Sequence, residues 1–229
     1  MAEALRVAIA PGEAVTALLY PAAAERRAGV ALILGHGAGA GQSSLFMVRC
    51  ATDLAARGID VVTFNFPYME RGRRLPDAND RLEACYRAVI AAMREHPTLG
   101  GVRLAIGGKS MGGRIASQVA AGGGVGDLAG LVLLGYPLHP PGKPERLRAM
   151  HLPRIGAPML FVQGERDAFG TPDELRPIIA ALAPPPDLYV VAGGDHSFKV
   201  RKGAGVPQQE VERAVQERIE CWLRRAAAP

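Results

Sequence analysis

Apolar residues follow two alternating patterns along the chain. Short runs of consecutive apolar residues indicate buried strands, and apolar residues that recur every three or four positions indicate amphipathic helices. Strands are predicted near residues 4–10, 15–20, 30–34, 59–66, 102–106, 129–136, 158–163 and 188–192. Helices are predicted over residues 44–57, 79–95 and 111–121, and from residues 171 and 207 onward. This alternation is typical of an α/β fold with a mostly parallel central sheet flanked by helices on both faces.

Length and composition favour a single domain over residues 1–229. A chain of 229 residues with 48% hydrophobic content can bury one substantial core, and no repeat or linker interrupts it. No apolar stretch reaches membrane-spanning length, and the N-terminus lacks the apolar core of a signal peptide. The three cysteines lack metal-ligand spacing. Cys85 and Cys221 fall on apolar faces of predicted helices, so we expect buried thiols in a reducing, cytoplasmic compartment.

The charge of the chain does not suggest a macromolecular partner. A net charge of +5 is carried mostly by scattered arginines interleaved with acids. Because no basic stripe or aromatic platform is visible, a solvated surface is favoured over a nucleic-acid face. We therefore expect neither nucleic acid nor a membrane as a partner, and the oligomeric state stays open between monomer and homodimer.

Residues 108–112 read Gly-Lys-Ser-Met-Gly between a predicted strand and a predicted helix. This G-x-S-x-G pattern predicts a tight, strained turn that exposes the Ser110 hydroxyl above the sheet, with glycines where the backbone is crowded. It resembles the nucleophile elbow of the α/β-hydrolases. A phosphate-binding P-loop would instead need glycine in place of Arg103, and a dinucleotide site at residues 35–40 would need an acid after the strand that ends at Phe66.

A serine nucleophile needs a base, which in this fold comes late in the chain. His196 directly follows the apolar run 188–192, at a strand end where a catalytic base is expected. His139 and His151 lie in a proline-rich stretch and are expected at the surface. His196 is therefore predicted to take the proton of Ser110.

The orienting carboxylate should lie between the serine and the histidine in the chain. Asp167 follows the predicted strand 158–163, and a capping-box pattern at residues 171–174 then begins a helix. Glu165 is the alternative. Asp167 is favoured because it lies farther past the strand end, where it can turn toward the histidine loop.

The glycine-rich loop after the strand 30–34 is expected to supply an oxyanion donor. In this fold the amide after the nucleophile, here Met111, is joined by an amide of that loop. Ala38 is the preferred partner and Gly37 the alternative. His36 precedes the serine, so we expect it to brace the loop.

Four segments carry the family resemblance: residues 36–39, 108–113, 164–167 and 194–196. On these the chain is similar to the compact α/β-hydrolases that include dienelactone-hydrolase-like and Tex30-like proteins. It departs from dienelactone hydrolase itself, whose nucleophile is cysteine, which weakens any transfer of substrate. The resemblance implies that a lid domain, in those members of the fold that have one, is inserted at the position of residues 137–158. That connection is short and proline-rich here, with at most a short helix near 144–151, so an open site without a large cap domain is expected.

Tyr68, Arg71 and Arg73 follow the strand that ends at Phe66, so they are expected near the edge of the site. Tyr68 and Arg71 are substrate-binding candidates because an arginine can hold an anionic substrate group; a solvated loop arginine is the alternative. Lys109 is expected to point away from the Ser110 hydroxyl.

The sequence thus predicts a carboxylesterase-like serine hydrolase that acts on small acyl esters without metal or organic cofactor. A thioesterase, an acyltransferase or a peptidase could use the same triad. A non-catalytic binding or scaffold protein with a hydrolase fold is the alternative from another class, since a fold does not fix a function.

Overall fold

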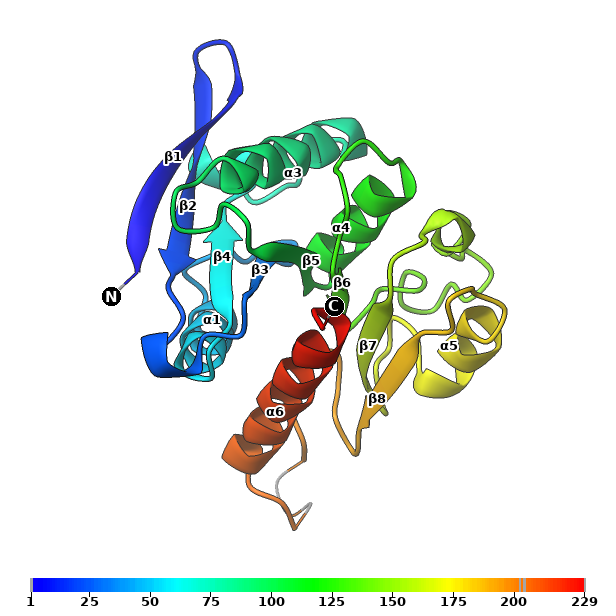
Figure 1. The fold of residues 1–229 in the computed structure, drawn as a ribbon. Coiled ribbons are helices and arrows are strands. Elements are labelled where there is room, and N and C mark those ends of the chain that lie inside the picture. The colour runs from blue at the N-terminus through cyan, green and yellow to red at the C-terminus, as the bar shows by residue number, and fades with distance from the viewer. Residues whose placement is uncertain (1, 202, 204, 229) are drawn as a thin grey trace.

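Strands and helices alternate along the computed structural model, which describes residues 2–201, 203 and 205–228 (Figure 1). Its strands are β1 (Glu3–Ala10), β2 (Glu13–Tyr20), β3 (Val30–Gly35), β4 (Asp60–Phe64), β5 (Arg103–Lys109), β6 (Gly130–Leu134), β7 (Met159–Gly164) and β8 (Asp187–Val191). Its α-helices are α1 (Leu45–Ala56), α2 (Pro67–Glu70), α3 (Asn79–Arg94), α4 (Met111–Ala121), α5 (Pro172–Ile179) and α6 (Gln208–Ala226). Two 3₁₀ turns, η1 (Ala24–Arg26) and η2 (Leu152–Arg154), complete the described elements.

All eight strands form one sheet in the order β1-β2-β4-β3-β5-β6-β7-β8. The strands from β4 to β8 in this order run parallel, and only β1 and β2 are antiparallel to their neighbours. The predicted α/β fold with a mostly parallel sheet is confirmed. Because parallel strands end at the same edge, the loops that follow β3, β5, β7 and β8 meet there.

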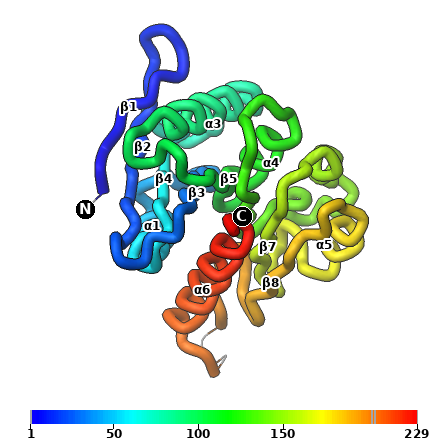
Figure 2. Tube along the Cα trace, in the orientation of Figure 1, coloured from blue at the N-terminus to red at the C-terminus, as the bar shows by residue number. Residues whose placement is uncertain are grey.

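Two hydrophobic cores cover the two faces of the sheet. Successive strand residues point to opposite faces, so Ile33 and Phe161 face the core under α3, α4 and α5, and Leu32 and Leu160 face the core under α1 and α6. Figure 2 shows α6, in red, crossing the sheet on the side of α1. Among the described residues, no helix has both the length and the apolar character needed to cross a membrane.

The connection over residues 144–151 contains no helix, which agrees with the expectation of at most a short one; the Arg148 N–H donates to the carbonyl of Leu138, and η2 follows. One expectation about local structure, the burial of Cys221, is wrong. Cys221 is exposed, whereas Cys50 and Cys85 are buried. The face of α6 that meets the sheet carries Ile219 and Trp222, and at 100° per residue Cys221 lies outside it.

Candidate active site

Ser110 lies at the apex of the turn between β5 and α4. Its backbone angles are φ 51° and ψ −115°, a region that L-residues rarely adopt, and its N–H donates to the Leu134 carbonyl at 2.9 Å. The structure therefore confirms the strained turn. Such strain persists only where the surrounding structure imposes it.

The end of β3 is what makes glycine necessary on both sides of Ser110. A Cβ atom on Gly108 would lie 2.3 Å from the Gly35 carbonyl oxygen, and one on Gly112 would lie 2.1 Å from the same oxygen. Both distances are far shorter than a van der Waals contact. The turn is thus pressed against the neighbouring strand, which fixes the position of the Ser110 hydroxyl.

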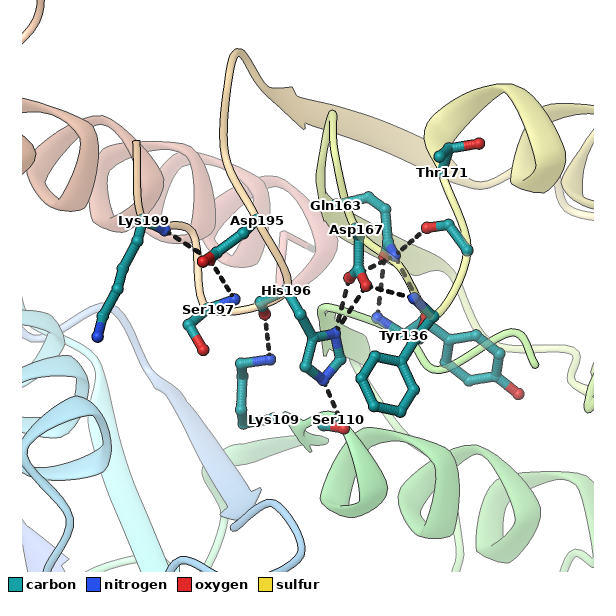
Figure 3. A network of polar contacts seen from close by, with 12 residues as sticks. Lys109, Ser110, Tyr136, Gln163, Asp167, Thr171, Asp195, His196, Ser197 and Lys199 are labelled. Atoms are coloured by element: carbon teal, nitrogen blue, oxygen red, sulfur yellow. Dashed lines mark hydrogen bonds and ion pairs between the residues drawn. The ribbon is translucent and has the colours of Figure 1, made fainter. Parts of the chain in front are cut away.

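His196 lies between Ser110 and Asp167 (Figure 3). Its Nε2 is 2.9 Å from Ser110 Oγ, and its Nδ1 is 2.9 and 2.8 Å from the two carboxylate oxygens of Asp167. The Phe169 ring lies against the imidazole, with 4.2 Å between ring centroids. A carboxylate on Nδ1 leaves Nε2 free of its proton and able to accept one from the hydroxyl.

Asp167 is held by a residue that the sequence analysis missed. Gln163, the buried polar residue near the end of β7, donates from Nε2 to Asp167 Oδ2 at 3.0 Å and to the Gly170 carbonyl at 2.7 Å. Its Oε1 accepts the Tyr136 N–H at 2.9 Å. The sequence did contain an indication of this role: Gln163 is a single amide residue at the end of an otherwise apolar strand, and a buried polar group needs hydrogen-bond partners.

Glu165 lies apart from the imidazole. It is exposed, and its carboxylate accepts the Gly193 N–H at 2.6 Å, which ties the loop after β7 to the loop after β8. The structure thus brings Asp167, and not Glu165, to His196.

Lys109 points away from the serine hydroxyl and toward the histidine loop. Its ammonium donates to the His196 carbonyl at 2.6 Å and lies 5.4 Å from the centre of the Phe198 ring. Burial lowers the pKa of Lys109 to about 8. The side chain therefore supports the loop that carries His196, and the imidazole is the basic group that contacts the hydroxyl.

Three backbone amides are available beside the hydroxyl. Gly37, Ala38 and Met111 line the same cavity as Ser110, and their N–H groups have no acceptor in the part of the chain that the structure describes. The Met111 amide also opens the helix α4, where amides lack intrahelical partners. Either Ala38 or Gly37 can act with Met111 as a donor pair.

His36 braces the loop that carries two of these amides. Its Nε2 accepts the Phe66 N–H at 3.0 Å, so its Nδ1 carries the proton and donates to the Gly37 carbonyl at 2.9 Å. The ring is fully buried, and burial lowers its pKa to about 4. A neutral imidazole thus connects the loop after β3 to the end of β4.

A cavity of about 780 Å³ opens beside Ser110. Its volume is in the range of small-molecule sites. Its walls come from the loop after β3, from α1, α4 and α6, and from the connection between β6 and β7. The wall includes Ser44, Leu45, Asp77, Arg114 and Arg148.

Tyr68 and Arg71 are not part of this cavity wall. Tyr68 is fully buried beside His36, with 5.8 Å between ring centroids, and Arg71 forms an ion pair with Glu13 at 2.5 Å. The cause lies in α2, where Glu70 accepts hydrogen bonds from Thr16 and draws the segment toward β2. The structure does not bring these two predicted residues to the serine.

His139 is buried, contrary to expectation, whereas His151 is half-buried. His139 is 5% exposed, with Nε2 at 3.3 Å from a Glu174 carboxylate oxygen. His151 is half-buried, with Nε2 at 2.7 Å from Ser117 Oγ on α4. The proline-rich connection lies against the protein, which buries His139 and partly covers His151. No group of three or more His, Cys, Asp or Glu side chains among the described residues could hold a metal ion.

Comparison with known proteins defines the family. Residues 28–224 match the family described as alpha/beta hydrolase domain, and the chain belongs to this family. The described connection between β6 and β7 holds only η2, without a cap domain.

Solved structures of similar fold include a lidless α/β serine hydrolase from Xanthomonas campestris, at 18% identity and a TM-score of 0.76, with 100% of this chain and 96% of that chain covered. An esterase from Pyrococcus furiosus is 14% identical with a TM-score of 0.77, covering 100% and 92%. A dienelactone hydrolase from Anabaena variabilis is 19% identical with a TM-score of 0.74, covering 97% and 96%. The expected resemblance to compact hydrolases of this fold is confirmed.

Proposed function

We propose that the protein is a serine hydrolase that cleaves small acyl esters, with Ser110, His196 and Asp167 as its catalytic triad. The observation that carries the proposal is the continuous hydrogen-bonded chain from Asp167 through His196 to Ser110 Oγ at the wall of a cavity. A strained turn holds the serine at that place. Structural hydroxyls rarely need such a costly arrangement.

The reaction proceeds in two halves. Ser110 Oγ attacks the ester carbonyl while its proton passes to His196 Nε2, and the amides of Met111 and Ala38 donate to the oxyanion. The carbon–oxygen bond to the alcohol breaks, and the alcohol leaves with the proton from His196. Water then attacks the acyl-serine, again giving its proton to His196, and the acid departs as Ser110 recovers its hydrogen. Asp167 stabilises the imidazolium in both halves.

A fluorophosphonate probe tests whether the serine is activated. We expect the probe to label wild-type protein on the peptide that contains Ser110, as read by mass spectrometry. Ser110→Ala should abolish labelling. Ser44→Ala is the matched control, because Ser44 lines the same cavity, lies far from His196 in the chain, and its side chain makes no capping hydrogen bond to α1. Unlabelled wild-type protein, or labelling that survives Ser110→Ala, contradicts the proposal and favours a non-catalytic role.

A further inference from the structure

Two arginines line the cavity beside Ser110 without forming an ion pair to any carboxylate that the structure describes. Arg114 donates to neutral oxygens of Gln118 and Asn79, each at 3.1 Å, and the Arg148 guanidinium has no acceptor in the described part of the chain. Neither forms an ion pair within 4.0 Å among the described residues. Surface arginines of the chain commonly do, and Arg81 on Glu13 is an example.

Helix geometry places Arg114 close to the reacting hydroxyl. The Arg114 N–H donates to the Ser110 carbonyl at 3.0 Å, so Arg114 lies one helical turn after Ser110, the residue that caps α4. Four residues of helix span about 6 Å along the axis. A long arginine side chain can therefore reach substrate atoms only a few bonds from the carbonyl that Ser110 would attack.

The connection between β6 and β7 brings Arg148 to the same place. The Arg148 N–H donates to the Leu138 carbonyl, and its own carbonyl accepts the Tyr136 hydroxyl at 2.7 Å. Three residues later, His151 lies 2.7 Å from Ser117 on α4. These contacts hold the segment against α4, so the position of Arg148 is fixed by the fold.

Both arginines are half-buried, and no carboxylate of the described residues forms an ion pair with either guanidinium group. Burial, and then the nearby charge of Arg148, lowers the pKa of Arg114. The negative charge of Glu83 acts in the opposite direction on the pKa of Arg114, but Glu83 forms no ion pair with it. Asp77 lines the cavity, but its carboxylate is engaged by Arg73 and Arg81. Like charges that are partly removed from water are unfavourable, and a bound oxyanion would relieve this cost through charge-assisted hydrogen bonds.

We propose that Arg114 and Arg148 form an anion subsite, and that the substrate of Ser110 is an ester carrying a carboxylate or phosphate group a few bonds from the scissile carbonyl. This inference rests on the proposed function. Arginine suits the role because its planar fork binds such oxygens bidentately.

Paired substrates test the subsite directly. The 4-nitrophenyl monoester of glutaric acid carries a free carboxylate, and its methyl-capped diester is a neutral match. We expect wild-type kcat/KM to be higher for the anionic ester by on the order of 10-fold, the effect of one hydrogen-bonded charge. An equal or lower value for the anionic ester in the wild type would overturn the subsite while leaving the hydrolase proposal intact.

Three variants identify the residues responsible. Arg148→Gln should reduce the anionic-to-neutral preference by on the order of 10-fold, and Arg114→Gln should do so as well. Arg154→Gln is the matched control, because Arg154 is exposed, lies outside the cavity wall and carries the same charge. If Arg154→Gln reduces the preference as much as Arg148→Gln, the effect is one of overall charge and the subsite is wrong.

A binding measurement keeps this result separate from catalysis. Calorimetry should detect binding of the glutarate monoester to the Ser110→Ala protein. The same measurement on the Ser110→Ala, Arg148→Gln double variant should show no binding. Competition by pentanoate and by propyl phosphate then distinguishes a carboxylate site from a phosphate site. Binding without any hydrolysis by wild-type protein would refute the proposed function alone, and absent binding would refute the subsite.

Discussion

Gln163 donates a hydrogen bond to Asp167 across 3.0 Å, between two residues that are each 1% exposed. Asp167 also accepts the Phe169 N–H at 2.8 Å. These two hydrogen bonds fix the orientation of the Asp167 carboxylate toward His196. A buried anion requires such partners, since an unpaired charge in the interior is costly.

Removing this support should impair turnover. Gln163→Met keeps the volume but deletes a donor to a charged group, so kcat should fall by on the order of 10-fold. Gln163→Glu should cost more, because a second carboxylate beside Asp167 opposes its ionised form. Steady-state kinetics at pH 7, with thermal unfolding as the folding control, gives the comparison. A Gln163→Met enzyme with wild-type kcat would contradict the role.

Asp167 and Glu165 are the two acids that could orient His196, and substitutions distinguish between them. Asp167→Asn should leave His196 in the wrong tautomer and lower kcat by roughly 10³–10⁴-fold. Glu165→Gln should cost far less, because that carboxylate bonds the Gly193 amide instead. Ester hydrolysis by both variants decides between them, and a reversed order of losses would transfer the role to Glu165.

The nucleophile is the most decisive position. Ser110→Ala should lower ester hydrolysis by on the order of 10⁴-fold or more with the fold intact. Circular dichroism should match the wild type. A variant that keeps more than about a tenth of wild-type turnover, well above the loss expected for a triad serine, would exclude Ser110.

Acid should destabilise the protein through His36. Its folded pKa of about 4 lies below its ordinary value of 6.5, so the unfolded chain binds the proton more readily between these values. The free energy of unfolding should therefore fall as pH drops from 6.5 to 4, by about 3 kcal/mol from this residue. Urea unfolding across that range should give a flatter pH dependence for His36→Gln. Identical slopes for variant and wild type would contradict this.

The open site should favour short acyl chains. Leu45 lines the cavity yet is 64% exposed, so this apolar wall also faces solvent. Each methylene contributes only about 0.8 kcal/mol where its burial is complete. For 4-nitrophenyl esters of two to sixteen acyl carbons, kcat/KM should stop rising after the first few carbons. It should not jump when the substrate aggregates. A maximum at the longest chains would reveal an acyl tunnel.

The sequence by itself determined the alternation of strands and helices and the strained turn at Ser110. These follow from local causes. Side-chain periodicity reports which face of an element is buried, and glycines on both sides of a serine report crowded backbone. The capping box at Thr171 and Glu174 is also local, and the structure contains it.

Only the tertiary structure decided which distant side chains meet. Gln163 reaches the Tyr136 N–H because β6 and β7 are neighbours in the sheet, and Arg148 reaches the cavity because its segment folds back onto α4. Arg71 is drawn away by contacts between α2 and β2 that no local pattern reveals. Loop direction depends on long-range hydrogen bonds and burial, and these are set by the packing of the whole chain.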